Sequence, residues 1–135
     1  MSSAVQLAKD SYTRSAGKDV IGRFYEIFLK SHPHIAPLFA ETDFVAQKET
    51  LNHGMHLAIM FAEGQALGKT GLERIRQSHC RNRLNISPML YPYWKKSFLQ
   101  AISETDPQFN EETRKAWDSV LQQTIDFISG GYDAY

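Results

Sequence analysis

The chain has 135 residues, and its 15 basic side chains balance 15 acidic ones, so the formal net charge is zero. This balance argues against a surface for nucleic acids or other polyanions, which needs a clustered excess of lysine and arginine. Apolar residues make up 42% of the sequence, enough for the core of a single domain spanning residues 1–135. The lone cysteine, Cys80, excludes an internal disulfide and fits a reducing compartment.

The N-terminal stretch MSSAVQLAKDS lacks the hydrophobic core of a signal peptide. The longest apolar run, Leu57 to Ala62, is too short to span a bilayer. We therefore expect a cytoplasmic protein with no membrane partner.

The first third of the chain predicts two helices followed by one short helical turn. Apolar residues recur at helical spacing over residues 4–16, and Asp19 is placed to cap a second helix. That helix must stop before Pro33, because proline disfavours helical geometry in the residue that precedes it. Together with Pro37, this leaves room only for a short helix ending at Phe39. The apolar face of the second helix consists of Ile21, Phe24, Tyr25, Phe28 and Leu29.

Thr42 and Asp43 resemble the start of another helix, whose apolar stripe extends to Ala62. The polar pair Gln47 and Lys48 interrupts this stripe. Such a pair costs stability unless its members find partners or reach the rim of the protein. Residues 64–71 are expected to form a loop.

The stretch GLERIRQSHCRNRL, residues 71–84, is centred on His79. Leu72, Ile75 and His79 recur at i, i+3 and i+7 and would share one face of a helix. The imidazole is then directed along an apolar stripe, where it must bond a partner or stay neutral. By itself, this pattern is also typical of a core histidine with a satisfied hydrogen bond.

The last third of the chain predicts two long helices. One starts at Ser87–Pro88 and ends near Glu104, and the other runs from Asn110 to the glycine pair 130–131. The tail, residues 132–135, is expected to be loosely packed. With no convincing strand, the pattern predicts an all-α fold of about seven helices that cross one another rather than form a four-helix bundle.

Other chemical signals are weak. The sequence contains no phosphate-binding loop, dinucleotide fingerprint, HExxH or CxxC. His53 and His56 have a spacing that can bind zinc, but no third ligand follows nearby. His32 and His34 flank a proline, a position typical of caps or surface groups.

Four segments together resemble a globin: FYEIFLKSHPHIAPLF at 24–39, QKETL at 47–51, SHC around His79, and AW at 116–117. The likeness is to bacterial single-domain globins and to the haem domain of flavohaemoglobins. Tyr25 lies 14 positions before Phe39, and Gln47 lies 32 positions before His79, as in those proteins. The resemblance covers nearly the whole chain and implies a globin-like fold.

The resemblance also implies a haem b cofactor, with His79 as the ligand of its iron. Ser78 and a backbone carbonyl near Ile75 would hold the second ring nitrogen of that histidine. A diatomic gas (O2, NO or CO) would then bind on the opposite, distal side. The further residues implied are Tyr25, Gln47 and Leu51 on the distal side, Phe39 stacked on the haem, Ile75, Leu84 and Ile86 on the proximal wall, and Lys48 near a propionate.

The function implied is reversible binding of O2 or another diatomic gas, for transport, storage or scavenging. Two alternatives stay open: a haem enzyme, such as a nitric-oxide dioxygenase or weak peroxidase working with a separate electron donor, or a stand-alone haem gas sensor. Flavohaemoglobin-like proteins carry a carboxylate fifteen positions after the last-helix tryptophan, where this chain has Tyr132. This departure disfavours peroxidase-style cleavage of an O–O bond.

A haem-free module of the same shape would have no reason to keep His79, Tyr25 and Gln47. His53 should face away from the iron, so no second histidine ligand is expected.

Overall fold

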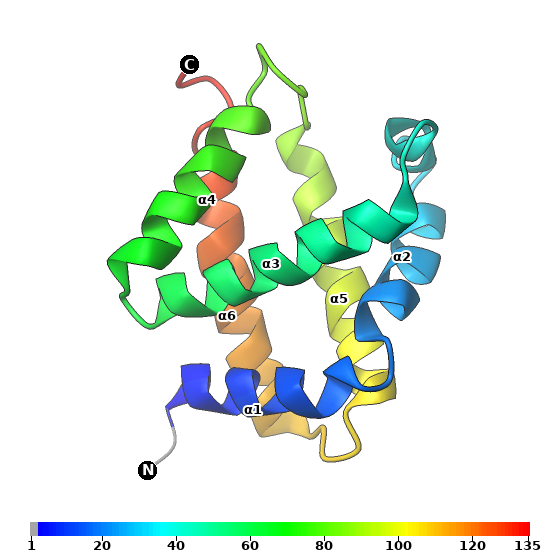
Figure 1. The fold of residues 1–135 in the computed structure, drawn as a ribbon, viewed down its shortest axis with the longest axis vertical. Helices are drawn as coiled ribbons and strands as arrows, with labels where there is room; N and C mark the ends of the chain where they lie inside the picture. The colour runs from blue at the N-terminus through cyan, green and yellow to red at the C-terminus, as the bar shows by residue number, and fades with distance from the viewer. Residues whose placement is uncertain (1–2) are drawn as a thin grey trace.

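The computed structural model describes residues 3–135, and all regular elements within that range are helices (Figure 1). This confirms the all-α fold. Instead of about seven helices there are six α-helices and two short 3-10 helices, because the prolines around Ala36–Phe39 leave room for only a 3-10 turn there. In chain order the elements are α1 (Ala4–Ala16), α2 (Val20–Ser31), η1 (Ala36–Phe39), α3 (Phe44–Ala62), α4 (Ala66–Ser78), η2 (Pro88–Leu90), α5 (Tyr91–Thr105) and α6 (Glu111–Ser129).

The predicted helix starts are confirmed by side-chain caps. Asp19, in the left-handed conformation at φ 52°, accepts a hydrogen bond from the Gly22 amide at the start of α2. Asp43 caps α3 and Asn110 caps α6 in the same way, each by satisfying an amide that has no partner within its helix. No helix within residues 3–135 is long and apolar enough to cross a membrane.

The prediction that residues 64–71 form a loop is wrong, because α4 begins at Ala66 and includes Gly68 and Gly71. The two glycines lie where α4 approaches α3 most closely. A Cβ atom at Gly68 would lie 2.4 Å from the Phe61 backbone nitrogen, and one at Gly71 would lie 2.6 Å from a Leu57 methyl carbon. They therefore serve close packing of two helices and do not mark a break between elements.

Helices α1 and α6 pack together, as do α2 and α5. Helices α3 and α4 pack closely near the short turn that joins them and diverge beyond it (Figure 1). The main core is aromatic. Phe98 and Trp117 are fully buried with ring centroids 5.3 Å apart, and Phe24 and Tyr12 extend the cluster. A second apolar cluster joins α3, α4, α6 and the first residue of α5; it consists of Leu57, Leu72, Tyr91, Ile125 and Ile128.

A buried ionic network joins α1 to the turn between α5 and α6. The Asp106 carboxylate, only 4% exposed, accepts hydrogen bonds from Arg14 at 2.7 and 2.9 Å and from the Ser11 hydroxyl at 2.6 Å. The Trp117 indole N–H donates to the same hydroxyl at 3.0 Å. Burial acts to raise the pKa of Asp106, but the bonds from Arg14, Ser11 and the Gln108 amide together hold it below its usual value.

Replacing Asp106 by alanine leaves Arg14 without its buried partner, and we expect the free energy of unfolding to fall by about 3 kcal/mol. The pKa of Asp106 is lower in the folded chain than in the unfolded chain. Its contribution to the free energy of unfolding is therefore complete above pH ~4 and is lost as the pH falls through the pKa of the folded state. Urea unfolding at pH 7 and pH 3 measures both effects. Glu111→Ala, which removes an exposed ion pair with Arg114, is the control and should lower the free energy of unfolding far less than Asp106→Ala does. Equal losses in the two variants would contradict the argument.

Candidate functional site

His79 lies directly after the last residue of α4 and caps that helix, with its own amide bonded to the Ile75 carbonyl. The ring nitrogen Nδ1 is 2.9 Å from the Ser78 hydroxyl oxygen. That hydroxyl donates its single hydrogen to the Ile75 carbonyl, also at 2.9 Å. Nδ1 must therefore carry a proton and donate it to Ser78, which leaves the Nε2 lone pair available to an outside partner.

The surroundings of His79 keep its ring neutral. Burial lowers the pKa of His79, and a hydrogen bond with the Ile75 backbone opposes that shift in part. Ile75 and Ile86 are half-buried and pack against the apolar cluster between α3, α4 and α6. Leu84, in the loop after His79, is 60% exposed. A neutral imidazole beside an apolar wall, with one lone pair free, is a suitable metal ligand.

Tyr25 and Gln47 form a second polar group, contributed by α2 and α3. The Gln47 amide nitrogen donates to the Tyr25 hydroxyl oxygen at 3.0 Å. The phenolic hydrogen has no acceptor among residues 3–135 and is free to donate. Burial raises the pKa of Tyr25, while the bond from Gln47 lowers it, and the net shift is upward. The phenol therefore stays protonated at neutral pH and remains a donor.

Aromatic rings surround this pair of donors. The Tyr25 ring is 4% exposed and lies edge-on to Phe39 and Phe44, with centroid distances of 5.8 and 5.5 Å. Phe39 and Phe44 stack on each other at 6.1 Å, and Leu51 lies partly buried against the same core. Phe44 is not among the site residues that the family resemblance implies, although its place on the apolar face of α3 is a signal that it packs inward.

Lys48, the other polar residue in the α3 stripe, pairs with Asp19 at 3.5 Å across to the start of α2. Both side chains are substantially exposed. The two members of the polar pair thus face different partners: Gln47 bonds Tyr25 in the interior, and Lys48 lies at the rim.

The helix face of α3 that carries Gln47 also contacts α4, the helix that precedes His79. Gln47, Leu51 and Gly54 recur at i, i+4 and i+7 and share that face. A Cβ atom at Gly54 would lie 3.9 Å from the Ile75 side chain, so this face is directed toward α4. His79 follows Ile75 by one helical turn. The face of α3 that carries Gln47 thus contacts α4 one turn before His79.

The C-terminal tail holds the loop that follows His79, so the expectation of a loosely packed tail is wrong. The Arg81 backbone amide donates a hydrogen bond to the Tyr132 carbonyl at 2.9 Å. The Arg81 guanidinium lies 4.6 Å from the centroid of the Tyr132 ring and forms an ion pair with Asp133 at 2.7 Å. The Tyr132 hydroxyl bonds the side chain of Asn85, which has a left-handed backbone at φ 53°. Tyr132 therefore supports this loop, at the position where flavohaemoglobin-like proteins are expected to carry a carboxylate.

The remaining histidines have other surroundings. His53 and His56 are exposed, and His56 lies edge-on to Tyr12 at 5.5 Å. His32 is the C-cap residue of α2 and accepts a hydrogen bond from the His34 amide at its Nδ1, while His34 is exposed, as expected for caps or surface groups. Within residues 3–135, no three His, Cys, Asp or Glu side chains gather in a way that would hold a metal ion.

Comparisons with known proteins concern the family and the fold of the whole chain. The globin family model matches residues 22–128. A crystal structure of a protein from Pseudomonas aeruginosa PAO1, described as structurally highly homologous to a human hemoglobin, superposes with a TM-score of 0.92. The two sequences are 35% identical, over 96% of this chain and 98% of that one. No curated protein matches the chain.

Arg81→Ala removes the ion pair with Asp133 and the contact with the Tyr132 ring. Because both contacts are exposed, we expect the global free energy of unfolding to change little. The loop after His79 should open more often, so the Asn85 amide should exchange hydrogen about 3- to 10-fold faster. Hydrogen exchange followed by NMR measures this rate. Arg83→Ala, a neighbouring exposed arginine, is the matched control; if it accelerates exchange equally, the tail does not hold the loop.

Proposed function

Because the chain belongs to the globin family, we propose that it is a haem-binding globin that reversibly binds O2 or another diatomic gas. The proposal treats residues 1–135 as a single globin domain acting in the cytoplasm, in gas transport, storage or scavenging. The observation that carries it is the hydrogen-bond chain from His79 to Ser78 to Ile75, which leaves one imidazole nitrogen free to bind iron.

The residues near His79 fit a haem group. A proximal histidine needs a neutral ring, a fixed tautomer and apolar neighbours, and His79 has all three. When bound, haem b supplies the iron to which the gas binds reversibly. In this proposal His79 is the metal ligand and Ser78 orients its ring. Further cofactor contacts come from Phe39, Ile75, Leu51, Leu84, Ile86 and Lys48.

Tyr25 and Gln47 are proposed to contact the gas. The Tyr25 hydroxyl has a hydrogen to donate, and one amide hydrogen of Gln47 already holds that hydroxyl in place. Phe39, Phe44 and Leu51 keep water from the donors, so that a hydrogen bond made there is stronger than one made in solvent. These two donors favour a ligand that acquires negative charge on binding.

The partners of His79 favour gas binding over peroxidase chemistry. Its Nδ1 donates to a neutral hydroxyl, and a neutral acceptor draws less electron density toward the ring than a carboxylate does. Tyr132, at the position of the relatives' carboxylate, bonds Asn85. An enzyme such as a nitric-oxide dioxygenase would use the same distal donors, but it would need a separate electron donor.

We expect His79→Ala to abolish the normal haem spectrum and most of the retained haem, because it removes the only histidine at the end of α4. Absorption spectra of the purified protein, oxidised, reduced and with CO, measure this directly. His53→Ala is the matched control, since His53 is an exposed histidine on α3, and its spectra should match those of the unmodified protein. An unchanged Soret band and CO spectrum in His79→Ala would show that another residue holds the iron.

Tyr25→Phe keeps the ring and removes only the hydroxyl. A donated hydrogen bond stabilises O2, which gains negative charge when bound, and hardly stabilises CO. We therefore expect O2 to dissociate about 5- to 100-fold faster, with a much smaller change for CO. Stopped-flow displacement of O2 by CO gives the rate. Tyr12→Phe changes a buried tyrosine in the core outside the site and is the control. Equal O2 off-rates in all three proteins would leave Gln47 as the only distal donor.

A further inference from the structure

Phe39 and Phe44 pack against the buried ring of Tyr25. Their ring centroids lie 5.8 and 5.5 Å from the centroid of Tyr25, and both contacts are edge-on. Tyr25 is only 4% exposed, whereas the two phenylalanines are half-buried. Each phenylalanine therefore reaches from the solvent to the tyrosine. A ligand that approaches the Tyr25 ring from this side must pass one of them.

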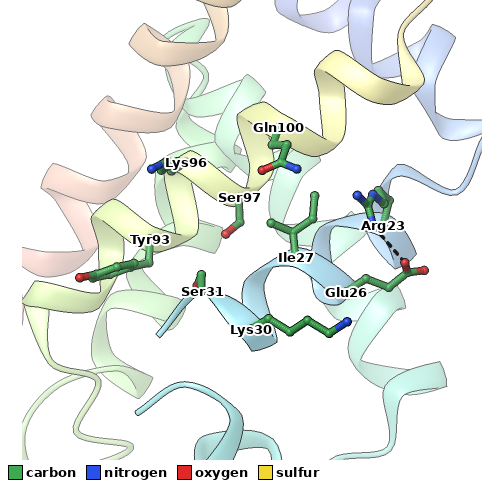
Figure 2. A pocket seen from close by; sticks show the side chains of 9 residues that line it. All are labelled: Arg23, Glu26, Ile27, Lys30, Ser31, Tyr93, Lys96, Ser97 and Gln100. Carbon is green, nitrogen blue, oxygen red and sulfur yellow. Dashed lines mark hydrogen bonds and ion pairs between the residues drawn. The ribbon is translucent and has the colours of Figure 1, made fainter. Parts of the chain in front are cut away.

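The helix that carries Tyr25 is held in place on its other side. Phe24, the preceding residue, is fully buried, with its ring centroid 5.8 Å from that of Phe98 on α5. Arg23 donates to Glu104 of α5 at 2.8 Å. Figure 2 shows Arg23 among the side chains that line the groove between these two helices. Because α2 is fastened to α5, any motion that uncovers Tyr25 must come from the elements that carry the two phenylalanines.

Helix α3 is fastened to α2 from Gln47 onward. The Gln47 amide nitrogen donates to the Tyr25 hydroxyl at 3.0 Å, and the next residue, Lys48, pairs with Asp19 at 3.5 Å. One turn later, Leu51 packs against the main core. The two proposed gas contacts, Tyr25 and Gln47, therefore keep their places when the residues before Gln47 move.

The three residues before Gln47 are held less firmly. They are the first residues of α3, and helix ends open more readily than helix interiors. Val45 among them is 75% exposed. The Asp43 carboxylate accepts hydrogen bonds from the Val45 amide at 3.0 Å and from the Ala46 amide at 3.4 Å, and the second distance is long for such a bond. When this segment frays, the Phe44 ring moves and the two donors stay.

Phe39 is the less mobile of the two covering rings. Its centroid lies 6.1 Å from that of Phe28, 5.8 Å from that of Tyr25 and 6.1 Å from that of Phe44. Its backbone carbonyl also accepts a hydrogen bond from the Thr42 amide at 3.1 Å. Moving Phe39 therefore disrupts more packing than moving Phe44, which has no printed ring contact with Phe28 to lose.

We propose that Phe44 selects ligands by size, as a gate carried by the first three residues of α3. In the closed position, its ring keeps water from the Tyr25 hydroxyl. In the open position, it leaves a passage that admits a diatomic gas more readily than a bulkier molecule, because a bulkier molecule needs a wider opening. The gate rests on the proposed function, and it adds a residue that the family resemblance does not imply.

The rate of ligand association with the reduced protein tests the selection by size. CO and n-butyl isocyanide are both neutral ligands of ferrous haem, and they differ in bulk. We expect Phe44→Ala to bind CO about 2- to 5-fold faster and n-butyl isocyanide at least about tenfold faster than the unmodified protein, as measured by stopped flow. Phe109→Ala removes another half-buried phenylalanine, outside the site, and is the matched control, with both rates unchanged.

Asp43→Ala tests whether the gate opens by fraying. The substitution removes the cap of α3 and leaves every ring in place, so the segment should fray about fivefold more often. Association of CO should then become about 2- to 5-fold faster. Asn110→Ala removes the corresponding cap of α6 and is the control. Thermal unfolding checks that each variant is folded, and this pair of variants decides the matter if Phe44→Ala does not fold.

A titration of Tyr25 tests the covering role of Phe44 without relying on haem. Burial raises the pKa of the Tyr25 hydroxyl, so uncovering the ring should lower this pKa toward its ordinary value. Carbon NMR of protein with isotope-labelled tyrosines follows the ionisation, and Tyr25→Phe identifies the signal. We expect a lower pKa of Tyr25 in Phe44→Ala than in the unmodified protein or in Phe109→Ala.

Failure of the gate and failure of the proposed function give different results. A purified chain without a haem spectrum would contradict the proposed function and, with it, the selection of gases, while the titration would still decide whether Phe44 covers Tyr25. With haem bound, three results overturn the gate. They are equal acceleration of CO and n-butyl isocyanide in Phe44→Ala, equal CO association in Asp43→Ala and Asn110→Ala, and an unchanged pKa of Tyr25 in Phe44→Ala.

Discussion

The close approach of α4 to α3 is the constraint on which the arrangement of the site depends. Gly68 and Gly71 leave no room for side chains at this crossing, so the two helices meet at their common turn and diverge beyond it. His79 directly follows the end of α4, and Gln47 lies in the first turn of α3. A larger residue at either glycine would push the helices apart and displace both groups at once.

In both polar groups of the candidate site, one polar side chain is oriented by a second one. Ser78 receives the Nδ1 proton of His79 and passes its own hydrogen to Ile75, and Gln47 donates to the oxygen of Tyr25. Ser78 occupies one ring nitrogen of His79 and leaves the other free, and Gln47 occupies the oxygen of the Tyr25 hydroxyl and leaves its hydrogen free. The same logic extends to the tail, where Arg81 and Tyr132 hold the loop that continues from His79.

Much of the fold follows from local chemistry. Apolar residues at helical spacing, capping side chains such as Asp19 and Asn110, and the prolines around η1 predicted where most helices begin and end. The resemblance carried by Tyr25, Phe39, Gln47 and His79 predicted the globin family, which the comparisons support. The roles of those residues toward haem and gas remain proposals.

What the sequence by itself determined were the properties that depend on neighbours in the chain: helix position, amphipathic faces and the spacing of the family motif. Only the tertiary structure decided what depends on contacts between distant segments. Glycines 68 and 71 resemble loop residues in sequence, yet they lie inside α4, because glycine suits both a flexible turn and a close helix crossing. The tail resembles a free end, yet Arg81 and Asn85, about fifty positions earlier, hold it in place. Local pattern cannot distinguish these cases, since the energy that decides them comes from atoms brought together by folding.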